Sequence, residues 1–517
     1  MLQKFVCVMT LALASISGYS ATQPNVLIIY ADDIGYGDLS CYGGTGADTP
    51  YIDALATKGV RFSSAYASAA TCTPSRYSLL TGEYAFRNKS AKILPGNAPL
   101  IIDTSKPNLA SFMKSAGYKT ALVGKWHLGL GLSDGSFDWN RNIKPAPREL
   151  GFDYSFYMAA TGDRVPSVYI ENSEIVNLDP KDPVKVSYKD KVGTEPTGIS
   201  HPELLTLQAD TQHAGTIVNG ISRIGTMTGG HAARFKDEDM ADTYLAKAVK
   251  FIAESKNQPF FMYYAAHDNH VPRRPHPRFQ GSSNLGARGD AIVQFDWTVG
   301  KLIQSLKENK LYANTLIILS SDNGPVLFDG YWEGSKVKNG THKPAGPFRG
   351  GKYSLWEGGT RMPFIVSWPT KIKPGTSSAL ISQVDIFASV AQAIEKTLPS
   401  NASPDGQNML SALMGDDSKG RQYLVEEALS QVALRMGDWK YIPAGTVTER
   451  GGLNEWIKTK VPAPGFLFNL ADDPGETQDL AASYPHRVKT MLNILKKEAP
   501  EKFTKKGLSQ KAQLGFE

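Results

Sequence analysis

The stretch Thr71-Cys72-Thr73-Pro74-Ser75-Arg76-Tyr77-Ser78-Leu79-Leu80-Thr81-Gly82 is the segment around which the rest of the chain is arranged. Proline is favoured in the first turn of a helix and glycine just after the last, so the stretch predicts a helix that starts at or just after Cys72. Backbone N–H groups point outward at such a start and the helix dipole is positive, which stabilises a sulfur nucleophile or a bound anion. Arg76 returns to the same face one turn later and adds a permanent positive charge. The stretch therefore predicts an anion site beside Cys72.

On both sides of this segment, from Pro24 onward, apolar runs of strand length alternate with helical patterns. This alternation predicts an α/β fold, with a large, mostly parallel sheet flanked by helices. The expected strands are residues 25–30, 60–62, 120–124, 259–264, 315–319 and 363–367, and the expected helices are 51–58, 109–115, 238–255, 289–309 and 384–394. The segment from 128 to about 234 is irregular and too long for an ordinary connection, so we interpret it as substrate-facing excursions over the sheet.

Residues 398–405 look like a domain boundary. Beyond them, short strands at 432–435 and 440–442 precede an amphipathic helix at 485–498, which favours a smaller C-terminal α+β subdomain with a short antiparallel sheet. The predicted organisation is a signal peptide at 1–21, a catalytic domain at 22–400 and a C-terminal subdomain at 401–517.

The N-terminus has the outline of a secretory signal peptide. Lys4 precedes an apolar run at 5–14 and then Ser- and Gly-rich residues, and the run is too short to span a bilayer. We therefore expect an exported protein, periplasmic or secreted, with no transmembrane segment. Removal of the peptide leaves Cys41 and Cys72, which either form one disulfide or, if Cys72 is modified, leave Cys41 as a lone thiol.

The 517 residues carry a formal net charge of +6 that is spread along the chain. A mild positive balance suits an anionic ligand, but a solvated surface explains it equally well. No basic run or nucleic-acid motif occurs, so the sequence gives no indication of DNA or RNA binding.

Polar clusters follow four of the predicted strands: Asp32-Asp33, Lys125 with His127, His267 with His270, and Asp322-Asn323. Ligands of open α/β sheets bind beyond the carboxyl ends of the strands, so we expect these clusters to meet in one crevice. The first and last clusters offer only oxygen ligands, which suit a hard cation such as calcium or magnesium. A single Asp-Asp pair more often caps a turn, but two acidic clusters at two strand ends favour a metal site.

The ordered set Cys72-x-Pro74-x-Arg76, followed by Leu80-Thr81-Gly82, resembles the signature of the formylglycine-dependent (type I) sulfatases of the alkaline phosphatase superfamily. Two further segments resemble that family, Gly124-Lys125-Trp126-His127-Leu128-Gly129 and Gly351-Lys352 with Glu357-Gly358-Gly359-Thr360-Arg361. The resemblance implies an alkaline phosphatase-like fold, sulfuric ester hydrolase activity and a bound Ca²⁺. It also implies that Cys72 is oxidised to Cα-formylglycine (3-oxoalanine) by a formylglycine-generating or sulfatase-maturing enzyme.

The same resemblance implies a role for each matching residue. The calcium ligands would be Asp32, Asp33, Asp322, Asn323 and the modified Cys72. Hydrated formylglycine 72, oriented by Arg76, would attack sulfur; Lys125 and Lys352 would bind sulfate, and His127 would help the second hydroxyl to expel it. His270 would protonate the departing oxygen, as an imidazole can near neutral pH. His267 is its local competitor, and spacing alone does not choose between them.

We expect loops to recognise the substrate, and the sequence is least informative about loops. Asp163 and Arg164, in Thr161–Pro166, are placed to bind sugar hydroxyls, and Arg273 and Arg274 are candidates to contact an acidic saccharide, although a salt bridge is an equal alternative for each. Resemblance to arylsulfatase and N-acetylgalactosamine-6-sulfatase-like enzymes implies a sulfated carbohydrate substrate, such as galactose or N-acetylgalactosamine sulfate. Three other classes stay open: a phosphonate or phosphodiester hydrolase of the same superfamily, a hydrolase with a Cys72 thiolate, and a non-catalytic glycan-binding protein.

Overall fold

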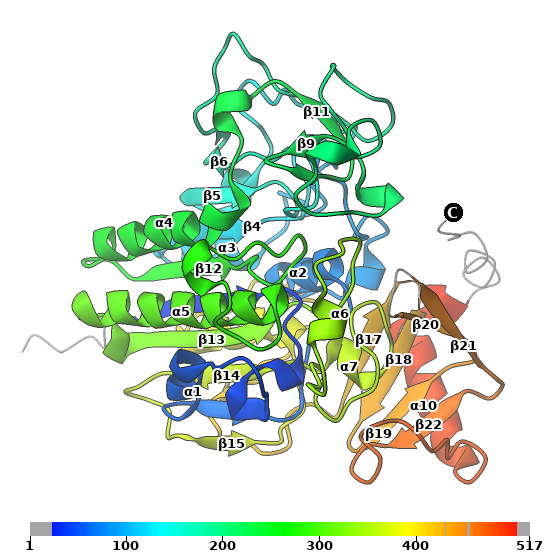
Figure 1. The fold of residues 1–517 in the computed structure, drawn as a ribbon. Helices are drawn as coiled ribbons and strands as arrows, with labels where there is room; N and C mark the ends of the chain where they lie inside the picture. The colour runs from blue at the N-terminus through cyan, green and yellow to red at the C-terminus, as the bar shows by residue number, and fades with distance from the viewer. Residues whose placement is uncertain (1–22, 430, 452–454, 504–517) are drawn as a thin grey trace, which may run out of the picture.

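The computed structural model describes residues 23–429, 431–451 and 455–503, shown as a ribbon in Figure 1. The predicted signal peptide, residues 1–21, lies outside these ranges. Within them, no helix is both long enough and apolar enough to cross a membrane.

A ten-stranded sheet forms the centre of the molecule, as expected for an α/β fold. Its four central strands run parallel, and β5 continues them on one side. Antiparallel strands lie towards both edges, so the sheet is mixed at its flanks. The strand order is β15 (Gly375–Ser377), β2 (Val60–Phe62), β14 (Phe364–Ser367), β13 (Thr315–Ser321), β1 (Asn25–Ala31), β12 (Phe260–Ala265), β4 (Lys119–Lys125), β5 (Tyr154–Met158), β6 (Ile170–Glu171) and β7 (Glu174–Ile175).

Both faces of this sheet are covered, which explains why its central strands are continuous apolar runs. Every residue of β1 is buried, and successive side chains enter opposite cores. Val26 and Ile28 belong to the core that contains α2 (Cys72–Thr81), α3 (Leu109–Ser115) and α8 (Ile386–Ala393). Leu27 and Ile29 belong to the core that contains α1 (Pro50–Ala56), α4 (Met240–Glu254) and α5 (Ala287–Glu308).

Helix α2 begins at Cys72, as the sequence predicts. Thr71, with extended backbone, precedes it, and Gly82 ends it in the left-handed conformation at φ 66°. The first nine residues of α2 are buried. The helix start therefore lies inside the molecule, where a charge placed beside it is poorly screened by water.

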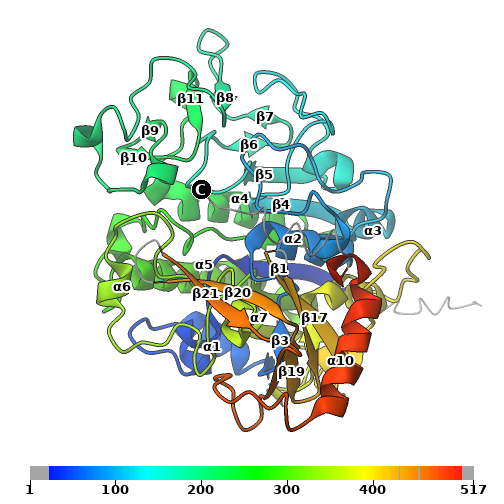
Figure 2. The ribbon, with the colours of Figure 1, turned by 90° about the vertical axis from the view of Figure 1, so that its right-hand side faces the viewer.

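The segment from 128 to about 234, which the sequence predicts to be irregular, differs in part from that prediction. Tyr154–Met158 was expected to be irregular, but it forms β5 and pairs in parallel with β4, and β6 and β7 extend the sheet further. Five residues are too few to show a period, so the neighbouring strand decides their conformation. The rest of the excursion has short antiparallel pairs, β8 (Lys185–Ser187) with β11 (Thr226–Thr228) and β9 (Ile217–Val218) with β10 (Ile221–Ser222), in the upper part of Figure 2.

The C-terminal part forms the expected small α+β unit. Its antiparallel sheet has the order β17 (Tyr423–Ala428), β18 (Gln431–Met436), β19 (Trp439–Ile442) and β22 (Phe466–Asn469). Helix α10 (Pro485–Glu498) packs against β18 and β19. A separate hairpin, β20 (Gly445–Arg450) with β21 (Trp456–Val461), lies in front of α7 (Glu357–Thr360) in Figure 2. Four further short elements are β3 (Ala65–Tyr66), β16 (Ile381–Ser382), α6 (Ser335–Lys338) and α9 (Leu410–Leu413), and short 3-10 helices occur between the named elements.

A buried charge cluster joins the C-terminal sheet to the main domain. The Lys440 ammonium in β19 lies 3.0 Å from carboxylate oxygens of both Glu357 and Glu426, and 3.5 Å from Glu476. All four side chains are fully buried. Glu357 begins α7, so Lys440 holds the segment of the main domain that contains Lys352 against the subdomain.

Lys440→Met should destabilise the protein by about 3–5 kcal/mol, because it leaves buried carboxylates without their shared cation. The free energy of unfolding from denaturant titration measures the loss. Lys489→Gln, at an exposed position of α10, is the control and should change it by less than about 0.5 kcal/mol. A Lys440→Met protein as stable as the control would show that this cluster does not join the two parts.

Candidate functional site

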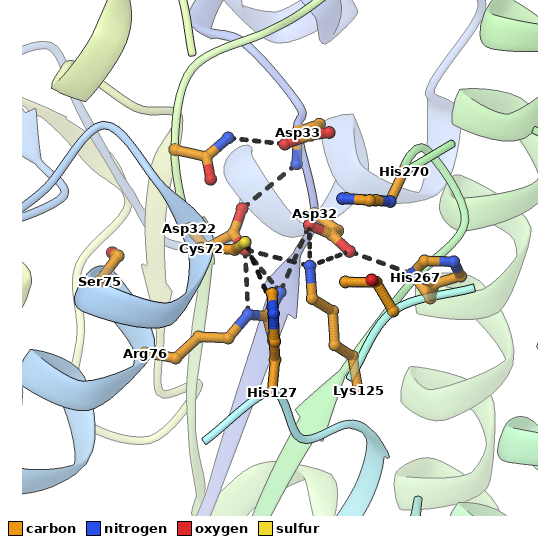
Figure 3. A network of polar contacts seen from close by, with 12 residues as sticks. Asp32, Asp33, Cys72, Ser75, Arg76, Lys125, His127, His267, His270 and Asp322 are labelled. Atoms are coloured by element: carbon orange, nitrogen blue, oxygen red, sulfur yellow. Dashed lines mark hydrogen bonds and ion pairs between the residues drawn. The ribbon is translucent and has the colours of Figure 1, made fainter. Parts of the chain in front are cut away.

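The four polar clusters lie together at one edge of the main sheet. Asp32 and Asp33 follow β1, Lys125 ends β4, His267 follows β12 and Asp322 follows β13. These strands are neighbours in the order β13-β1-β12-β4 and run parallel, so their carboxyl ends meet. Helix α2 brings Cys72 and Arg76 to the same place, as Figure 3 shows.

The acidic members of this cluster form a set of oxygen donors. Asp32, Asp33 and Asp322 are buried, and each offers a carboxylate oxygen within 4.8 Å of the others. The Asn323 side-chain nitrogen donates to Asp33 at 2.7 Å, which leaves its oxygen buried with no partner among the described residues. Burial and then the charge of Asp32 raise the pKa of Asp322 to about 7, so the carboxylates repel one another. This donor set fits a hard divalent cation.

Three buried cations surround the carboxylates. Arg76 donates to Asp322 at 2.7 and 3.0 Å, and the Lys125 ammonium lies 2.8 Å from both oxygens of Asp32. Lys352 donates to Asp33 at 2.9 Å and to Asp329, which the sequence did not single out, at 3.1 Å. An anion that reaches this place would meet several positive charges with little solvent screening.

Cys72 contacts His127 at the start of α2. The Nε2 atom of His127 lies 2.9 Å from the Leu94 carbonyl and must donate to it, so Nδ1 is the acceptor that faces Cys72 Sγ at 3.3 Å. Burial lowers the pKa of His127 well below its usual value and raises the pKa of the Cys72 thiol. The pair is therefore a neutral thiol beside a neutral imidazole, which is the opposite of what a thiolate hydrolase needs. Cys41 and Cys72 are both free in the structure, with no disulfide between them.

The contacts of His267 and His270 distinguish these two candidates for the residue that protonates the departing oxygen. The Gly162 backbone N–H donates to His267 Nε2 at 3.1 Å, so Nδ1 carries the proton and donates to Asp32 at 3.2 Å. Both nitrogens of His267 are thus occupied by protein. His270 uses only Nδ1, which donates to the Val271 carbonyl at 2.7 Å, and no hydrogen bond to its Nε2 occurs within the described residues. Burial, then the charges of Lys352 and Lys125, lower the pKa of His270 well below its usual value.

The Asp163 and Arg164 pair lies beside this centre. Arg164 donates to both oxygens of Asp163 at 2.8 Å, and Gly162 joins their loop to His267. The excursion adds His213, whose Nε2 lies 3.5 Å from Asp163 and whose Nδ1 lies 2.6 Å from Asp210. Burial opposes its charge, but these two carboxylates raise the pKa of His213 to about 9. The sequence reasoning missed His213, because no local pattern shows which loop folds back onto Asp163.

The two arginines after His270 have different surroundings. Arg273 is fully buried, pairs with Glu333 and donates to the carbonyls of Asn269 and Val326 at 2.8 and 2.7 Å. Those protein partners do not favour the predicted contact between Arg273 and substrate. Arg274 is half-buried and donates to the exposed Thr206 at 2.8 Å.

Comparison with known proteins agrees with this arrangement. The Sulfatase family model matches residues 24–396. The chain is 48% identical to an N-acetylgalactosamine-6-O-sulfatase of Bacteroides thetaiotaomicron over 93% of this chain and 94% of that one. It is 29% identical to human arylsulfatase A over 94% and 89% of the two chains.

A solved structure from Bacteroides thetaiotaomicron, described in work on the metabolism of multiple glycosaminoglycans, matches with a TM-score of 0.89 and 48% identity over 93% of this chain and all of that one. With a family match that spans the whole main sheet and a close relative along nearly all of its length, this chain belongs to the sulfatase family and is a sulfuric ester hydrolase.

Proposed function

We propose that this sulfatase removes sulfate from glycans, with a galactose or N-acetylgalactosamine sulfate as its substrate. The observation that carries the proposal is the Asp163, Arg164 and His213 cluster beside the buried cations. Its Arg164 side chain is 14% exposed, so a charged hydrogen-bond donor remains accessible, and such a group suits sugar hydroxyls rather than an apolar alcohol. The relative at 48% identity, an N-acetylgalactosamine-6-O-sulfatase, supports the same class.

We further propose that Cys72 is converted to formylglycine and that Asp32, Asp33, Asp322 and Asn323, with residue 72, hold Ca²⁺. The unpartnered oxygen of Asn323 and the mutual repulsion of the carboxylates support the cation. When bound, calcium would polarise a sulfate oxygen as a Lewis acid, and the hydrated aldehyde would supply the attacking hydroxyl and a second one through which sulfate leaves. We also propose that residues 1–21 are a signal peptide that directs export of the protein.

The chain's own residues then bind, orient and move protons. Lys125 and Lys352 stabilise negative charge on the sulfate oxygens, and their buried positions keep those charges effective. Arg76 fixes Asp322 and the start of α2. His127 Nδ1, kept as an acceptor by the Leu94 carbonyl, takes a proton from residue 72. His270 Nε2 is the nitrogen left for the leaving oxygen, because Nδ1 already donates its proton to Val271. Nε2 must therefore take up a proton, which the negative charge of bound sulfate favours, before His270 can deliver it to that oxygen.

Sulfate release from sulfated mono- and oligosaccharides should exceed turnover of an aryl phosphodiester if the sulfatase proposal holds. Cys72→Ala should reduce sulfate release by at least about 10³-fold, because the nucleophile is lost. Protein from a host with a sulfatase-maturing enzyme should show the mass of formylglycine in the peptide that contains residue 72. Full activity of protein whose Cys72 remains a thiol would overturn the formylglycine proposal, and preferred phosphodiester turnover would favour the phosphonate hydrolase alternative.

Removal of divalent cations with a chelator should abolish sulfate release and lower the melting temperature, since the carboxylates then repel one another without a cation. Ca²⁺ should restore both, because a ligand bound only by the folded state stabilises it. Asp322→Asn is the matched variant and should need more Ca²⁺ for the same thermal shift. Unchanged melting and activity after complete chelation would contradict the metal site.

His267 should act as a positioning residue, and two variants separate its contacts. Asn is short and places its amide where Nδ1 of His267 lies, so it can still donate to Asp32. Gln is longer and places its amide where Nε2 lies, so it can still accept from Gly162 N–H. A buried group left unpaired costs about 1–3 kcal/mol, so each variant should weaken either glycan binding or Ca²⁺ binding by about 10- to 100-fold. His267→Asn should raise KM for glycans and His267→Gln should weaken Ca²⁺ binding. Identical defects in both variants would show that His267 does not link Asp32 to the loop of Gly162 through two separate contacts.

A further inference from the structure

Lys352 is a buried lysine whose ammonium is held by two carboxylates. Its Nζ atom donates to Asp33 at 2.9 Å and to Asp329 at 3.1 Å, and its side chain is 1% exposed. An ammonium has three N–H donors, and within the described residues no third hydrogen bond from Nζ occurs. Two protein contacts therefore fix the direction of the ammonium and leave one donor for a ligand.

The two carboxylates that hold Lys352 are not equivalent. Asp33 belongs to the oxygen set proposed to hold Ca²⁺, and its other oxygen accepts from Asn323 at 2.7 Å. A bound cation would therefore compete with Lys352 for the negative charge of Asp33. Asp33, Asp329 and His270 also lie close enough to hold an ion, yet the Lys352 ammonium already bridges these two carboxylates. Asp329 is thus the partner whose charge is left to the lysine.

One oxygen of Asp329 accepts from two consecutive residues. Besides the Lys352 ammonium, Oδ2 accepts from the Tyr353 hydroxyl at 2.9 Å. The backbone N–H of Lys352 donates to the Pro325 carbonyl at 3.0 Å, and that of Tyr353 donates to the Ala70 carbonyl at 2.7 Å. Tyr353 has a φ of 73°, in the left-handed region that non-glycine residues rarely adopt, and such conformations persist where the surrounding structure fixes them. The segment is therefore held through its backbone and through Asp329.

Asp329 is itself held in place by the loop that carries His213. The next residue, Gly330, accepts at its carbonyl from the Asp210 N–H at 2.8 Å. A Cβ atom at Gly330 would lie 2.1 Å from the His213 ring, so this close approach requires glycine. Burial raises the pKa of Asp329, but nearby cations, Lys352 first, lower it overall. Asp329 is therefore a charged group with a fixed position.

We propose that Asp329 is a positioning residue for sulfate recognition, which fixes the Lys352 ammonium so that its free donor reaches a sulfate oxygen. Asp329 acts through Lys352 and does not contact sulfate, because two negative groups repel each other. Without Asp329, the carboxylate of Asp33 would draw the ammonium towards itself and away from sulfate. This inference rests on the proposed role of Lys352 as a sulfate ligand.

The test uses the Ca²⁺-loaded protein and measures its affinity for inorganic sulfate by calorimetry, together with kcat and KM for each sulfate ester that it cleaves. Asp329→Ala should weaken sulfate binding and raise KM by about tenfold, with a smaller change in kcat, because the charge-assisted hydrogen bond that orients the ammonium is lost. The loss should be equal for aryl and sugar sulfates, since it concerns the sulfate and not the alcohol.

Two milder variants keep part of the arrangement. Asp329→Asn retains an oxygen that accepts from both Lys352 and Tyr353, so it should recover most of the loss. Tyr353→Phe removes only the hydroxyl that donates to Asp329 and should give a smaller loss in the same direction. Lys352→Ala/Asp329→Ala should bind sulfate no more weakly than Lys352→Ala alone, because Asp329 acts through the lysine.

Glu171→Ala is the matched control. Glu171, in the short strand β6 near one edge of the sheet, accepts from the Lys247 ammonium at 2.9 Å and from the Tyr154 hydroxyl at 2.7 Å, which is the same pair of donor types. Its loss should leave sulfate affinity and KM unchanged. The melting temperature of every variant shows how much stability each change costs.

The outcomes separate this inference from the proposed function. Unchanged sulfate affinity in both Asp329→Ala and Tyr353→Phe, an equal loss in Asp329→Asn, or a further loss in the double variant would overturn the inference. A loss confined to sugar sulfates would also overturn it, because Asp329 would then act on the sugar. Unchanged affinity in Lys352→Ala would overturn the proposed role of the lysine itself. Cleavage of aryl sulfate but of no glycan would overturn the glycan substrate and leave the role of Asp329 standing.

Discussion

The balance between buried carboxylates and buried cations at one edge of the sheet is the constraint on which the site depends. Asp32, Asp33 and Asp322 come from two adjacent strands, and their cations Arg76, Lys125 and Lys352 come from three other segments. Buried charges are tolerated only when they are paired, so each segment must arrive in register. In the proposed function, the same pairing holds positive charge ready for sulfate, because none of these groups needs to leave water when the substrate binds.

The protein around this centre supplies hydrogen bonds that leave each imidazole one role. The Leu94 carbonyl makes His127 an acceptor at Nδ1, the Gly162 N–H makes His267 a donor at Nδ1, and the Val271 carbonyl leaves only Nε2 of His270 for the reaction. Three histidines of one cluster thus present different hydrogen-bonding atoms, although their side chains are chemically identical. A side chain added at Gly162 would lie 2.5 Å from His267 Nε2, so this contact also requires glycine at that position.

The C-terminal subdomain contributes to the site indirectly. Lys440 binds Glu357 and the hairpin contacts Tyr353, and both residues follow Lys352 in the same segment. The proposed sulfatase centre therefore depends on the main sheet, which positions most of its groups, and on the C-terminal four-stranded sheet and hairpin, which contact the segment of Lys352. Loops of the excursion close the remaining side, where His213 meets Asp163.

The sequence by itself determined the central strands, the start of α2 at Cys72 and the meeting of four strand ends, because these follow from local periodicity, capping residues and the geometry of parallel sheets. It also determined the family through the motif at Cys72. Only the tertiary structure decided that Tyr154–Met158 joins the sheet, that His267 is fully engaged while His270 is not, that Arg273 is buried against Glu333, and that Asp329 and His213 belong to the site. These outcomes depend on contacts between residues far apart in the chain, and no local pattern specifies which loop packs against which.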